Sequence, residues 1–527
     1  MTFSKPNASA ATLTKNRTPF DINPFSGMCV TCIEGCVGLC EIGKSAYRGV
    51  EIIYPQPFGP ITAASQKDYP VDLSHFNIMG SCVGAHGIKP DSDVAIFPNV
   101  NIETSLGRDK GIKLKLPIVT PGLGSTDVAK RNWEGIAIGS AMSGIVMTIG
   151  ENVCGMDEKA ETKNGRVIKS PDLEHRVQLY REWQEDGYGK IVVQSNVEDT
   201  RLGVLEYAIE KLNVESVELK WGQGAKNIGG EVKISDLKKA QLLKKRGYIV
   251  LPDPEDPVVI DAFERKVFKE FERHSRIGMV EEESFIKRVE ELRKLGAKYV
   301  FLKTGAYRPA DLARAIKFSS ESKIDVLTVD GAGGGTGMSP WRMMNEWGVP
   351  TVELACLTYQ YADTLSKKKQ YVPDIVFAGG LTLEDHIFKV LALGAPYFKA
   401  AGMARAPIAA AMVGKTLARC IKDENIPSAV EKYGKTIDEI FVTVPYLRKK
   451  YGKKFSDLPV SAMAVYTYYQ RLAQGLKQLM CGARKFSLEY IDRNDIAALT
   501  EESAKISGIK YVMDTDREEV EKILKNP

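Results

Sequence analysis

The stretch Asp325-Val-Leu-Thr-Val-Asp-Gly-Ala-Gly-Gly-Gly-Thr-Gly-Met-Ser-Pro340 joins an apolar run to five glycines within seven residues. A buried strand followed by a glycine turn and a helix is how a parallel sheet brings bare backbone N–H groups to an anion. Glycine permits the tight turn and the close approach. The stretch therefore predicts a phosphate site, with a flexible loop as the alternative. It fits neither the dinucleotide nor the nucleoside-triphosphate fingerprint, because no Gly-x-Gly-x-x-Gly runs through it and no Gly-Lys-Ser/Thr follows.

Further apolar runs of strand length alternate with helical segments on both sides of this stretch. They are residues 116–120, 144–148, 191–194, 216–220, 299–303, 375–378 and 397–400. Together with residues 326–329 they make eight strand–helix units over ~300 residues, which predicts an α/β fold, a (β/α)8 TIM barrel. An open doubly wound sheet is the alternative. The long connection 221–298 contains charged stretches such as 261–273, which we expect to be solvated helix faces.

The composition is that of an ordinary soluble protein. The chain has 527 residues, 44% hydrophobic and 26% charged, with a net charge of +5. Lysines and acidic residues interleave, which argues against a nucleic-acid patch. No apolar run approaches the ~20 residues that cross a bilayer, and the N-terminus lacks a signal-peptide core, so we expect a cytoplasmic protein that binds no membrane. We expect an N-terminal cap over residues 1–115, the barrel over 116–425 and a C-terminal helical extension over 426–527.

Four cysteines close together suggest a metal or redox centre. Cys29, Cys32, Cys36 and Cys40 have the spacing Cys-x2-Cys-x3-Cys-x3-Cys. Zinc usually takes two separated cysteine pairs, whereas one contiguous run better suits an iron–sulfur cluster. We therefore expect a cluster, of the 4Fe-4S type, with zinc or no metal as the alternatives. Cys82 or His86 could replace one ligand. The scattered Cys154, Cys356, Cys420 and Cys481 are expected to be small buried residues.

The residues that end the strands carry the chemistry, because the active sites of such barrels lie at the carboxyl ends of the strands. Two lysines, Lys220 and Lys303, end the fourth and fifth strands and point cations into the mouth. Glycine-rich ends follow the sixth, seventh and eighth strands, where barrels commonly bind phosphate. The other residues singled out at strand ends are Gly122, Ser125, Glu151, Gln223, Lys226, Gly379, Gly380 and Gly402.

Several motifs in this order resemble the synthase domain of glutamate synthase. Glu218-Leu-Lys-Trp-Gly-Gln-Gly-Ala-Lys-Asn-Ile-Gly-Gly-Glu231 is similar to its Gln-Gly-Ala-Lys-Pro-Gly-Glu-Gly-Gly-Gln segment, and Val329–Pro340 is similar to its Ser-Gly-His-Asp-Gly-Gly-Thr-Gly-Ala-Ser-Pro. Ala378-Gly-Gly-Leu381 resembles its Asp-Gly-Gly-Leu, and Gly150-Glu-Asn152 falls at its Gly-Glu-Gly-Gly. The resemblance covers roughly residues 110–420.

The resemblance implies an FMN enzyme that converts 2-oxoglutarate and ammonia to glutamate through 2-iminoglutarate. It implies that Glu151, Gln223 and Lys226 line the substrate pocket as catalytic residues. Lys220 and Lys303 would face the flavin ring or its ribityl chain. The remaining cofactor contacts would be Gly122, Ser125, Gly333, Gly334, Gly335, Thr336, Gly337, Gly379, Gly380 and Gly402.

The departures from the family bear on partners and substrate. The chain begins Met1-Thr2, where the glutaminase domain of the family begins with cysteine, so ammonia is expected from solution or a separate subunit. The family's cluster cysteines are missing from residues 404–415, and the Cys29–Cys40 module could replace them. Glu231 stands for a glutamine, and Ala332-Gly333 for a His-Asp pair. An acidic residue in place of the amide would repel a dicarboxylate.

Two further functions are alternatives to a glutamate synthase-like oxidoreductase. One is an amine-transferring subunit that resembles N-methylglutamate synthase, in which the flavin need not undergo net redox, so the cysteine module counts against it. The other is a non-catalytic electron-transfer subunit. No nicotinamide fingerprint is visible, which favours ferredoxin or a redox partner subunit as electron donor, and we expect an oligomer.

Overall fold

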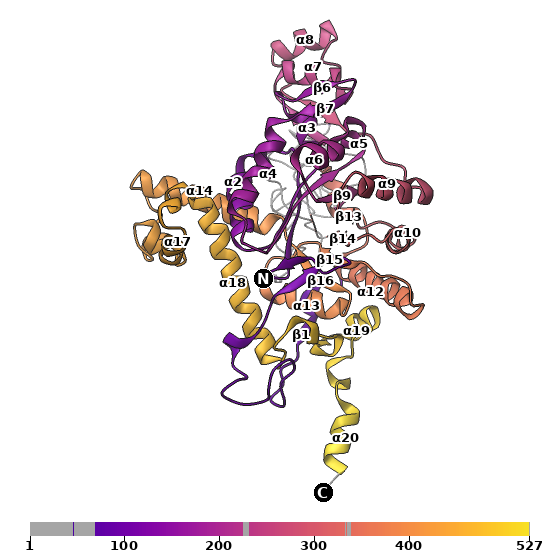
Figure 1. The fold of residues 1–527 in the computed structure, drawn as a ribbon, viewed down its shortest axis with the longest axis vertical. Coiled ribbons are helices and arrows are strands. Elements are labelled where there is room, and N and C mark those ends of the chain that lie inside the picture. The colour runs from indigo at the N-terminus through magenta and orange to yellow at the C-terminus, as the bar shows by residue number, and fades with distance from the viewer. Residues whose placement is uncertain (1–45, 47–68, 225–230, 333, 335–338, 526–527) are drawn as a thin grey trace, which may run out of the picture.

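The computed structural model describes residue 46 and residues 69–224, 231–332, 334 and 339–525 (Figure 1). Its centre is a closed barrel of eight strands, all paired in parallel. In chain order the strands are β4 (Ile118–Leu123), β5 (Val146–Ile149), β8 (Ile191–Ser195), β9 (Ser216–Lys220), β13 (Tyr299–Thr304), β14 (Val326–Asp330), β15 (Asp374–Ala378) and β16 (Phe398–Gly402). The pairing of β16 with β4 closes the ring. The (β/α)8 prediction is therefore confirmed, and the open sheet is wrong.

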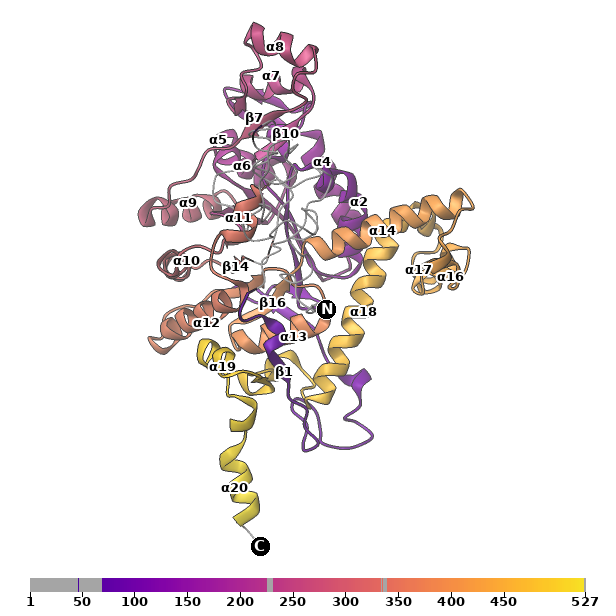
Figure 2. The same cartoon turned by 180° about the vertical axis from the view of Figure 1, so that it is seen from behind.

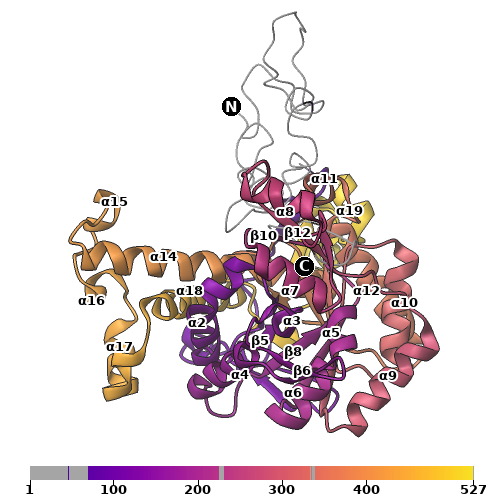
Figure 3. The same ribbon diagram turned by 90° about the horizontal axis from the view of Figure 1, so that it is seen from above.

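Each barrel strand is followed by a helix that covers the outside of the ring, since parallel strands need a crossover between them. The helices are α2 (Asp127–Met142), α4 (Pro171–Trp183), α6 (Val204–Leu212), α9 (Glu282–Lys294), α10 (Pro309–Glu321), α12 (Thr351–Lys367), α13 (Glu384–Gly394) and α14 (Arg405–Lys422). Figure 3 shows α2, α4, α6, α9, α10 and α12 spread around the strands. Short helices α3 (Val153–Met156), α5 (Val197–Leu202) and α11 (Trp341–Glu346) and the hairpin β6 (Glu161–Lys163)–β7 (Arg166–Lys169) lie in these connections.

The barrel interior is apolar toward its amino-terminal end. Val119, Val146, Val192, Val326 and Val376 belong to one buried cluster there. The hairpin β2 (Thr104–Leu106)–β3 (Ile112–Leu114) packs into the same cluster and covers this end of the barrel. Ion pairs from the hairpin to residues at the starts of β14 and β15 hold it in place. The polar end of the barrel is thus the opposite one, where the strands finish.

The connection between β9 and α9 folds into a small unit with its own sheet. The strands β10 (Glu231–Ile234), β12 (Phe271–His274) and β11 (Ile249–Leu251) pair in that antiparallel order, with α7 (Leu237–Lys245) and α8 (Pro257–Glu264) between them. We call residues 231–276 the insertion. Figure 1 shows it at one end of the molecule.

The predicted helix over residues 261–273 was wrong in its second half. Helix α8 ends at Glu264, and β12 begins at Phe271. Phe271 and Arg273 are 0% and 1% exposed, on the buried face of the strand. The period-two burial of β12, formed with partners distant in sequence, overrode the local charge pattern that suggested a solvated helix.

The segments on either side of the barrel meet each other. β1 (Phe76–Ile78) pairs antiparallel with β17 (Ile496–Ala498), so the predicted helical extension also contains a strand. Its helices are α15 (Ser428–Glu431), α16 (Ile437–Ile440), α17 (Val444–Tyr451), α18 (Val460–Gly482), α19 (Glu501–Ser507) and α20 (Arg517–Lys525). Figure 2 shows α18 crossing α14, against which it packs, and α20 projecting from the body. Among the described residues, the 3-10 helices are Leu73–His75, Phe97–Asn99, Gly452–Asp457, Leu488–Tyr490, Arg493–Asp495 and Val512–Asp514. The three domain boundaries stay predictions.

Within the described part of the chain, no helix is long and apolar enough to span a membrane.

Candidate functional site

Three of the residues singled out at strand ends form one hydrogen-bonded group at the barrel mouth. Lys220, the last residue of β9, donates from Nζ to Glu151 Oε1 and to Gln223 Oε1, each at 2.6 Å. Glu151 follows β5, and Gln223 lies three residues beyond Lys220. The side chains of Lys220 and Glu151 are only 9% and 18% exposed. An ammonium has three N–H donors, so two of those on Lys220 are accounted for by these contacts.

The carboxyl of Glu151 is ionised at neutral pH because of this arrangement. Burial by itself would raise its pKa, but the charge and hydrogen bond of Lys220, with the charge of Lys303, outweigh burial and bring the pKa of Glu151 down to about 2. A carboxylate of this kind orients a cation and does not donate a proton near neutral pH.

A second lysine–carboxylate pair lies on the neighbouring strands. Lys303 Nζ is 3.2 Å from Asp330 Oδ2, at the ends of β13 and β14, and the lysine side chain is 6% exposed. Burial would lower the pKa of Lys303, but Asp330, Glu218 and Glu151 outweigh it, so that the pKa is raised. Both mouth lysines are therefore already paired with acidic residues.

Beneath the mouth, a polar layer that the sequence reasoning missed faces the barrel interior. Gln194 Nε2 donates a short hydrogen bond to Glu218 Oε1, and Thr328 Oγ1 donates to Glu218 Oε2 at 3.4 Å. Burial raises the pKa of Glu218, against the opposing charge of Lys303. Gln194 Oε1 is buried without a hydrogen-bond partner. The signal was present, because Glu218 precedes Lys220 by two residues and a strand puts such residues on one face.

Glycines bring the strand ends close together at this face. A Cβ on Gly224, just after β9, would lie 2.0 Å from the carbonyl oxygen of Gly331, just after β14. Gly379 has φ +135° and Gly380 has φ +86°, which L side chains rarely adopt. A Cβ on Gly379 would also lie 2.8 Å from Thr351 Oγ1. Backbone, rather than side chains, therefore lines this part of the mouth.

The remaining candidate residues are placed as follows. Gly122 is in β4, beside the amide of Gln194, Ser125 is in the loop before α2, Gly334 approaches Asp330, and Gly402 ends β16 beside Ala378. Lys226, Gly333, Gly335, Thr336, Gly337 and the cysteines Cys29, Cys32, Cys36 and Cys40 lie outside the described residues.

Arg405 is a cation at this face that sequence reasoning also missed. It is the first residue of α14, directly after β16, and is half-buried. Burial lowers the pKa of its guanidinium. Its position one turn beyond a strand end was the available signal, because anions bind at such helix starts.

The other cysteines and the alternative ligands are dispersed. Cys154 and Cys356 are buried, as expected, Cys420 and Cys481 are half-buried, and Cys82 is exposed. The backbone of His86 forms an isolated β-bridge with Lys485, and the His86 ring centroid lies 6.3 Å from that of Tyr490. No group of three or more metal-ligating side chains occurs among the residues that the structure describes.

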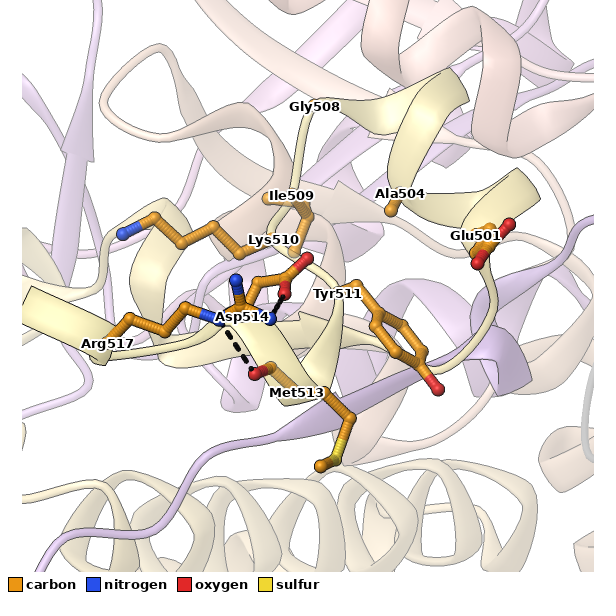
Figure 4. Close-up of a pocket in the computed structure, with 9 residues that line it drawn as sticks. All are labelled: Glu501, Ala504, Gly508, Ile509, Lys510, Tyr511, Met513, Asp514 and Arg517. Carbon is orange, nitrogen blue, oxygen red and sulfur yellow. Dashed lines mark hydrogen bonds and ion pairs between the residues drawn. The ribbon is translucent and has the colours of Figure 1, made fainter. Parts of the chain in front are cut away.

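A separate cavity of about 630 Å³ lies on the C-terminal segment, between α19 and the start of α20 (Figure 4). Lys510, Tyr511 and Arg517 are among its lining residues, and Arg517 is paired with Asp514. Figures 1 and 2 place α19 and α20 at the opposite end of the molecule from the insertion. This cavity is therefore not part of the barrel mouth.

The fold and the mouth define a (β/α)8 barrel protein with paired buried charges and glycine-lined strand ends. Residues 273–422 match a family model described as "Conserved region in glutamate synthase". This part of the chain runs from β12 to the end of α14 and includes Lys303, Asp330 and the glycine turns after β14, β15 and β16. The second half of the barrel thus matches this family model, and the match confirms the resemblance for the motifs at residues 329–340 and 378–381.

The chain is also similar to several solved structures. A putative lactate oxidase of Pediococcus acidilactici is 12% identical, with 81% of this chain and 84% of that chain covered and a TM-score of 0.43. The flavin-binding domain of flavocytochrome b2 of baker's yeast is 12% identical, with 86% and 82% covered and a TM-score of 0.46. A mandelate oxidase variant with an FMN adduct is 12% identical, with 80% and 87% covered and a TM-score of 0.43. No curated protein matches the chain.

Proposed function

We propose that the protein is a flavin-dependent oxidoreductase that holds FMN in the barrel mouth. The match of residues 273–422 to the conserved region of glutamate synthase is the observation that carries this proposal. The residues of the mouth fit the cofactor. Gln194 Oε1 is a buried acceptor without a partner, and Lys220 and Lys303 supply buried positive charge. Gly379 and Gly380, both with positive φ, follow the seventh barrel strand, where such barrels commonly bind phosphate.

The finer proposal is the reduction of an imine to an amino acid. A 2-oxo acid, of which 2-oxoglutarate is the expected one, and ammonia lose water to form the imine. The imine carbon then takes a hydride and the nitrogen takes a proton. Reduced FMN, when bound, would supply the hydride. Two electrons from reduced ferredoxin or a redox partner subunit, with one proton from solvent, would restore the reduced cofactor, and no other oxidant or reductant is needed.

The residues of the chain bind and orient in this reaction. The Glu151 carboxylate and the Gln223 amide oxygen fix the ammonium of Lys220, so that its third N–H is directed by two hydrogen bonds. That N–H is the donor available to an anionic group of the substrate or cofactor. Because the pKa of Glu151 is about 2, we propose Lys220, rather than Glu151, as the proton-bearing member of the pair. Lys226 remains proposed as a substrate-carboxylate ligand.

The cysteine module is proposed to carry electrons between the donor and the flavin. Its ligands would be Cys29, Cys32, Cys36 and Cys40, and the proposal rests on their spacing in the sequence. A 4Fe-4S cluster takes four thiolates, which is the number that the module offers. Ammonia would come from solution or from a separate subunit.

Cofactor content gives the first test. The purified protein, kept under argon, is expected to contain about one FMN and one four-iron cluster per chain, by flavin and iron assays and an absorbance spectrum. A colourless protein that takes up no FMN on titration would contradict the flavin proposal, and an iron-free protein with zinc would contradict the cluster.

A turnover assay tests the reaction. Reduced ferredoxin, ammonia and 2-oxoglutarate are expected to give glutamate. Glu151→Gln is expected to abolish turnover. Glu206→Gln is the matched control, because Glu206 lies on α6, outside the mouth. Its side chain is 20% exposed and forms an ion pair with Arg288 at 3.0 Å. Flavin reoxidation by a different 2-oxo acid with ammonia would keep the class and reject 2-oxoglutarate. Product formed from methylamine and glutamate without electron transfer would reject imine reduction in favour of the amine-transferring alternative.

A further inference from the structure

The four-residue helix α3 begins two residues after Glu151 and is held by residues far away in the sequence. Its N-terminal neighbour Asn152 adopts a left-handed backbone conformation, φ 65° and ψ 13°, and is 2% exposed. On the other side, the backbone of Glu151 touches Gly124, where a Cβ would lie 2.4 Å from the Glu151 carbonyl oxygen. The direction of the Glu151 side chain is therefore set by what holds Asn152 and α3.

The insertion holds α3 through a hydrophobic and a polar contact. Met156, the last residue of α3, is buried in the insertion's own apolar core. Tyr248, which precedes β11, donates from its hydroxyl to Asn152 Oδ1 at 3.1 Å. Gly155 lies so close to this tyrosine that a Cβ would be 1.8 Å from the hydroxyl oxygen. Helix α3 is thus packed against the insertion.

Arg246 of the insertion caps the end of α3. Its Nη1 donates to the carbonyl oxygens of Gly155 at 2.8 Å and Asp157 at 2.7 Å, and its Nη2 donates to that of Ala160 at 3.1 Å. The last carbonyls of a helix lack partners within it, and a guanidinium satisfies them. One side chain of the insertion therefore fixes the segment that leads from α3 to β6.

Asp199 of α5 holds the beginning of the same segment. Its Oδ2 accepts from the backbone N–H of Asn152 at 2.8 Å, in addition to a capping contact with Asn196 at 3.3 Å. The side chain is 1% exposed, and Oδ1 has no hydrogen-bond partner. Capping of α5 alone explains the contact with Asn196 but not the one with Asn152, which lies 47 residues away.

The charged and titratable groups around Asp199 come from α3 and the turn before it, and from the insertion. Burial and, less strongly, the charge of Glu151 raise the pKa of Asp199 to about 7, against the backbone hydrogen bonds of Asn152 and Asn196 and the charge of Arg273 of β12, which lower it. Tyr248 and Cys154 also face it. The carboxyl is therefore an acceptor for Asn152 whose strength changes around neutral pH.

We propose that Tyr248, Arg246 and Asp199 are positioning residues, which hold α3 and so fix Glu151 against Lys220, making the insertion a working part of the active site. The effect on catalysis rests on the proposed function, whereas the hold on α3 does not.

The alkylation rate of Cys154, which lies inside α3 and is 2% exposed, measures how firmly α3 is held and does not depend on catalytic activity. Its rate of alkylation by iodoacetamide in the full-length protein is compared by peptide mass spectrometry with that of Cys356, which is 2% exposed on α12. Tyr248→Phe is expected to raise the Cys154 rate about fivefold relative to Cys356, the change that one lost buried hydrogen bond gives.

Tyr180→Phe is the matched control, because Tyr180 is 0% exposed and donates one hydrogen bond to the Ile145 carbonyl on the barrel wall. It is expected to leave the ratio of the two rates unchanged. Arg246→Lys is expected to raise the ratio of the Cys154 to the Cys356 alkylation rate, as Tyr248→Phe does. With two variants, the test still stands if one of them folds poorly. Equal ratios in Tyr248→Phe, Arg246→Lys and the control would overturn the proposal.

Kinetics then separate positioning from stability. In the turnover assay, Tyr248→Phe is expected to lower kcat about tenfold with KM nearly unchanged, because a displaced Glu151 misorients Lys220 after the substrate is bound. The kcat of the wild type is expected to fall as pH drops through about 7, where Asp199 takes up a proton, and Asp199→Asn should lose this step. Unchanged kcat in Tyr248→Phe despite a raised labelling ratio would overturn the catalytic consequence. If the wild type shows no turnover but Tyr248→Phe raises the labelling ratio, the proposed function is refuted, while the inference that these residues hold α3 stands.

Discussion

Replacing Lys220 with methionine tests whether the buried pair at the mouth is as strongly coupled as its geometry indicates. Lys220 Nζ lies 2.6 Å from Glu151 Oε1, and both side chains are largely buried. Burial would raise the pKa of Glu151, yet Lys220 and, less strongly, Lys303 bring it from its ordinary 4.5 to about 2. At about 1.4 kcal/mol for each pKa unit, the lowered pKa corresponds to ~3 kcal/mol of folding free energy at neutral pH.

The expected loss in Lys220→Met follows from the same numbers. An unfolding entropy of about 2.1 cal/mol/K per residue gives the 527 residues ~1.1 kcal/mol/K. A loss of ~3 kcal/mol then lowers Tm by ~3 °C, and an uncompensated buried carboxylate adds to the loss. The effect has a defined pH window. A carboxyl whose pKa is lower in the folded chain contributes stability above pH 4.5 and loses it as pH falls toward 2. The difference between wild type and variant should therefore shrink below pH 4.5.

Thermal unfolding followed by circular dichroism at pH 7 and pH 4 measures this difference. Lys89→Met is the control, since Lys89 is 74% exposed and its pair with Asp91 is expected to contribute little. Adding Glu151→Gln to Lys220→Met should restore part of the lost stability, because no carboxylate is then left unpaired. A loss in Lys220→Met no larger than that of the control, or equal at both pH values, would refute the coupling.

Three further outcomes are expected. Glu218→Gln should stabilise the protein more at pH 8 than at pH 4 in thermal unfolding. Burial raises the pKa of this carboxyl, so its ionisation destabilises the folded protein as pH rises. A larger gain at pH 4 would contradict this. Gly379→Ala should lower bound FMN at least tenfold by absorbance, owing to its φ of +135° and the contact with Thr351, whereas Gly165→Ala, with φ +75° and open space around it, should not; equal FMN content would refute the role of the turn. Cys36→Ser should lower iron per chain while Cys420→Ser leaves it unchanged, and equal iron content in both would remove Cys36 from the cluster.

The strands of the barrel could be predicted because each carries its own signal. A buried parallel strand is a short apolar run that needs no partner to be recognised, and the runs ending at Lys220 and Lys303 also fixed which residues reach the mouth. The same rule placed Lys220 and Glu151 at one face, where strand ends of a barrel meet, but their direct contact was not predicted.

What could not be predicted depends on contacts between distant segments. Tyr248 meets Asn152 across 96 residues of sequence, and nothing local marks either residue. Arg273 stood in a charged stretch that looks solvated, yet it is 1% exposed, because the insertion folds back and buries one face of β12. The alternation of side chains along a strand could have placed Glu218 on the same face as Lys220. That prediction first required recognising the strand as part of a closed barrel with a polar inner layer.

The pairing of both mouth lysines restricts how the site can recognise its substrate. Lys220 is bound to Glu151 and Lys303 to Asp330, so the carboxylates already offset much of the positive charge that a second substrate carboxylate would need. The second carboxylate of a dicarboxylate can bind either lysine strongly only if it weakens the ion pair of that lysine with Glu151 or Asp330. In the proposed reaction, charge selection between mono- and dicarboxylic 2-oxo acids would therefore come from other groups. These are Lys226, backbone N–H groups at the glycine turns, or Arg405, which has no acidic partner among the described residues. Comparing 2-oxoglutarate with pyruvate in Arg405→Met would separate these sources, because only a role of Arg405 predicts a selective loss for the dicarboxylate.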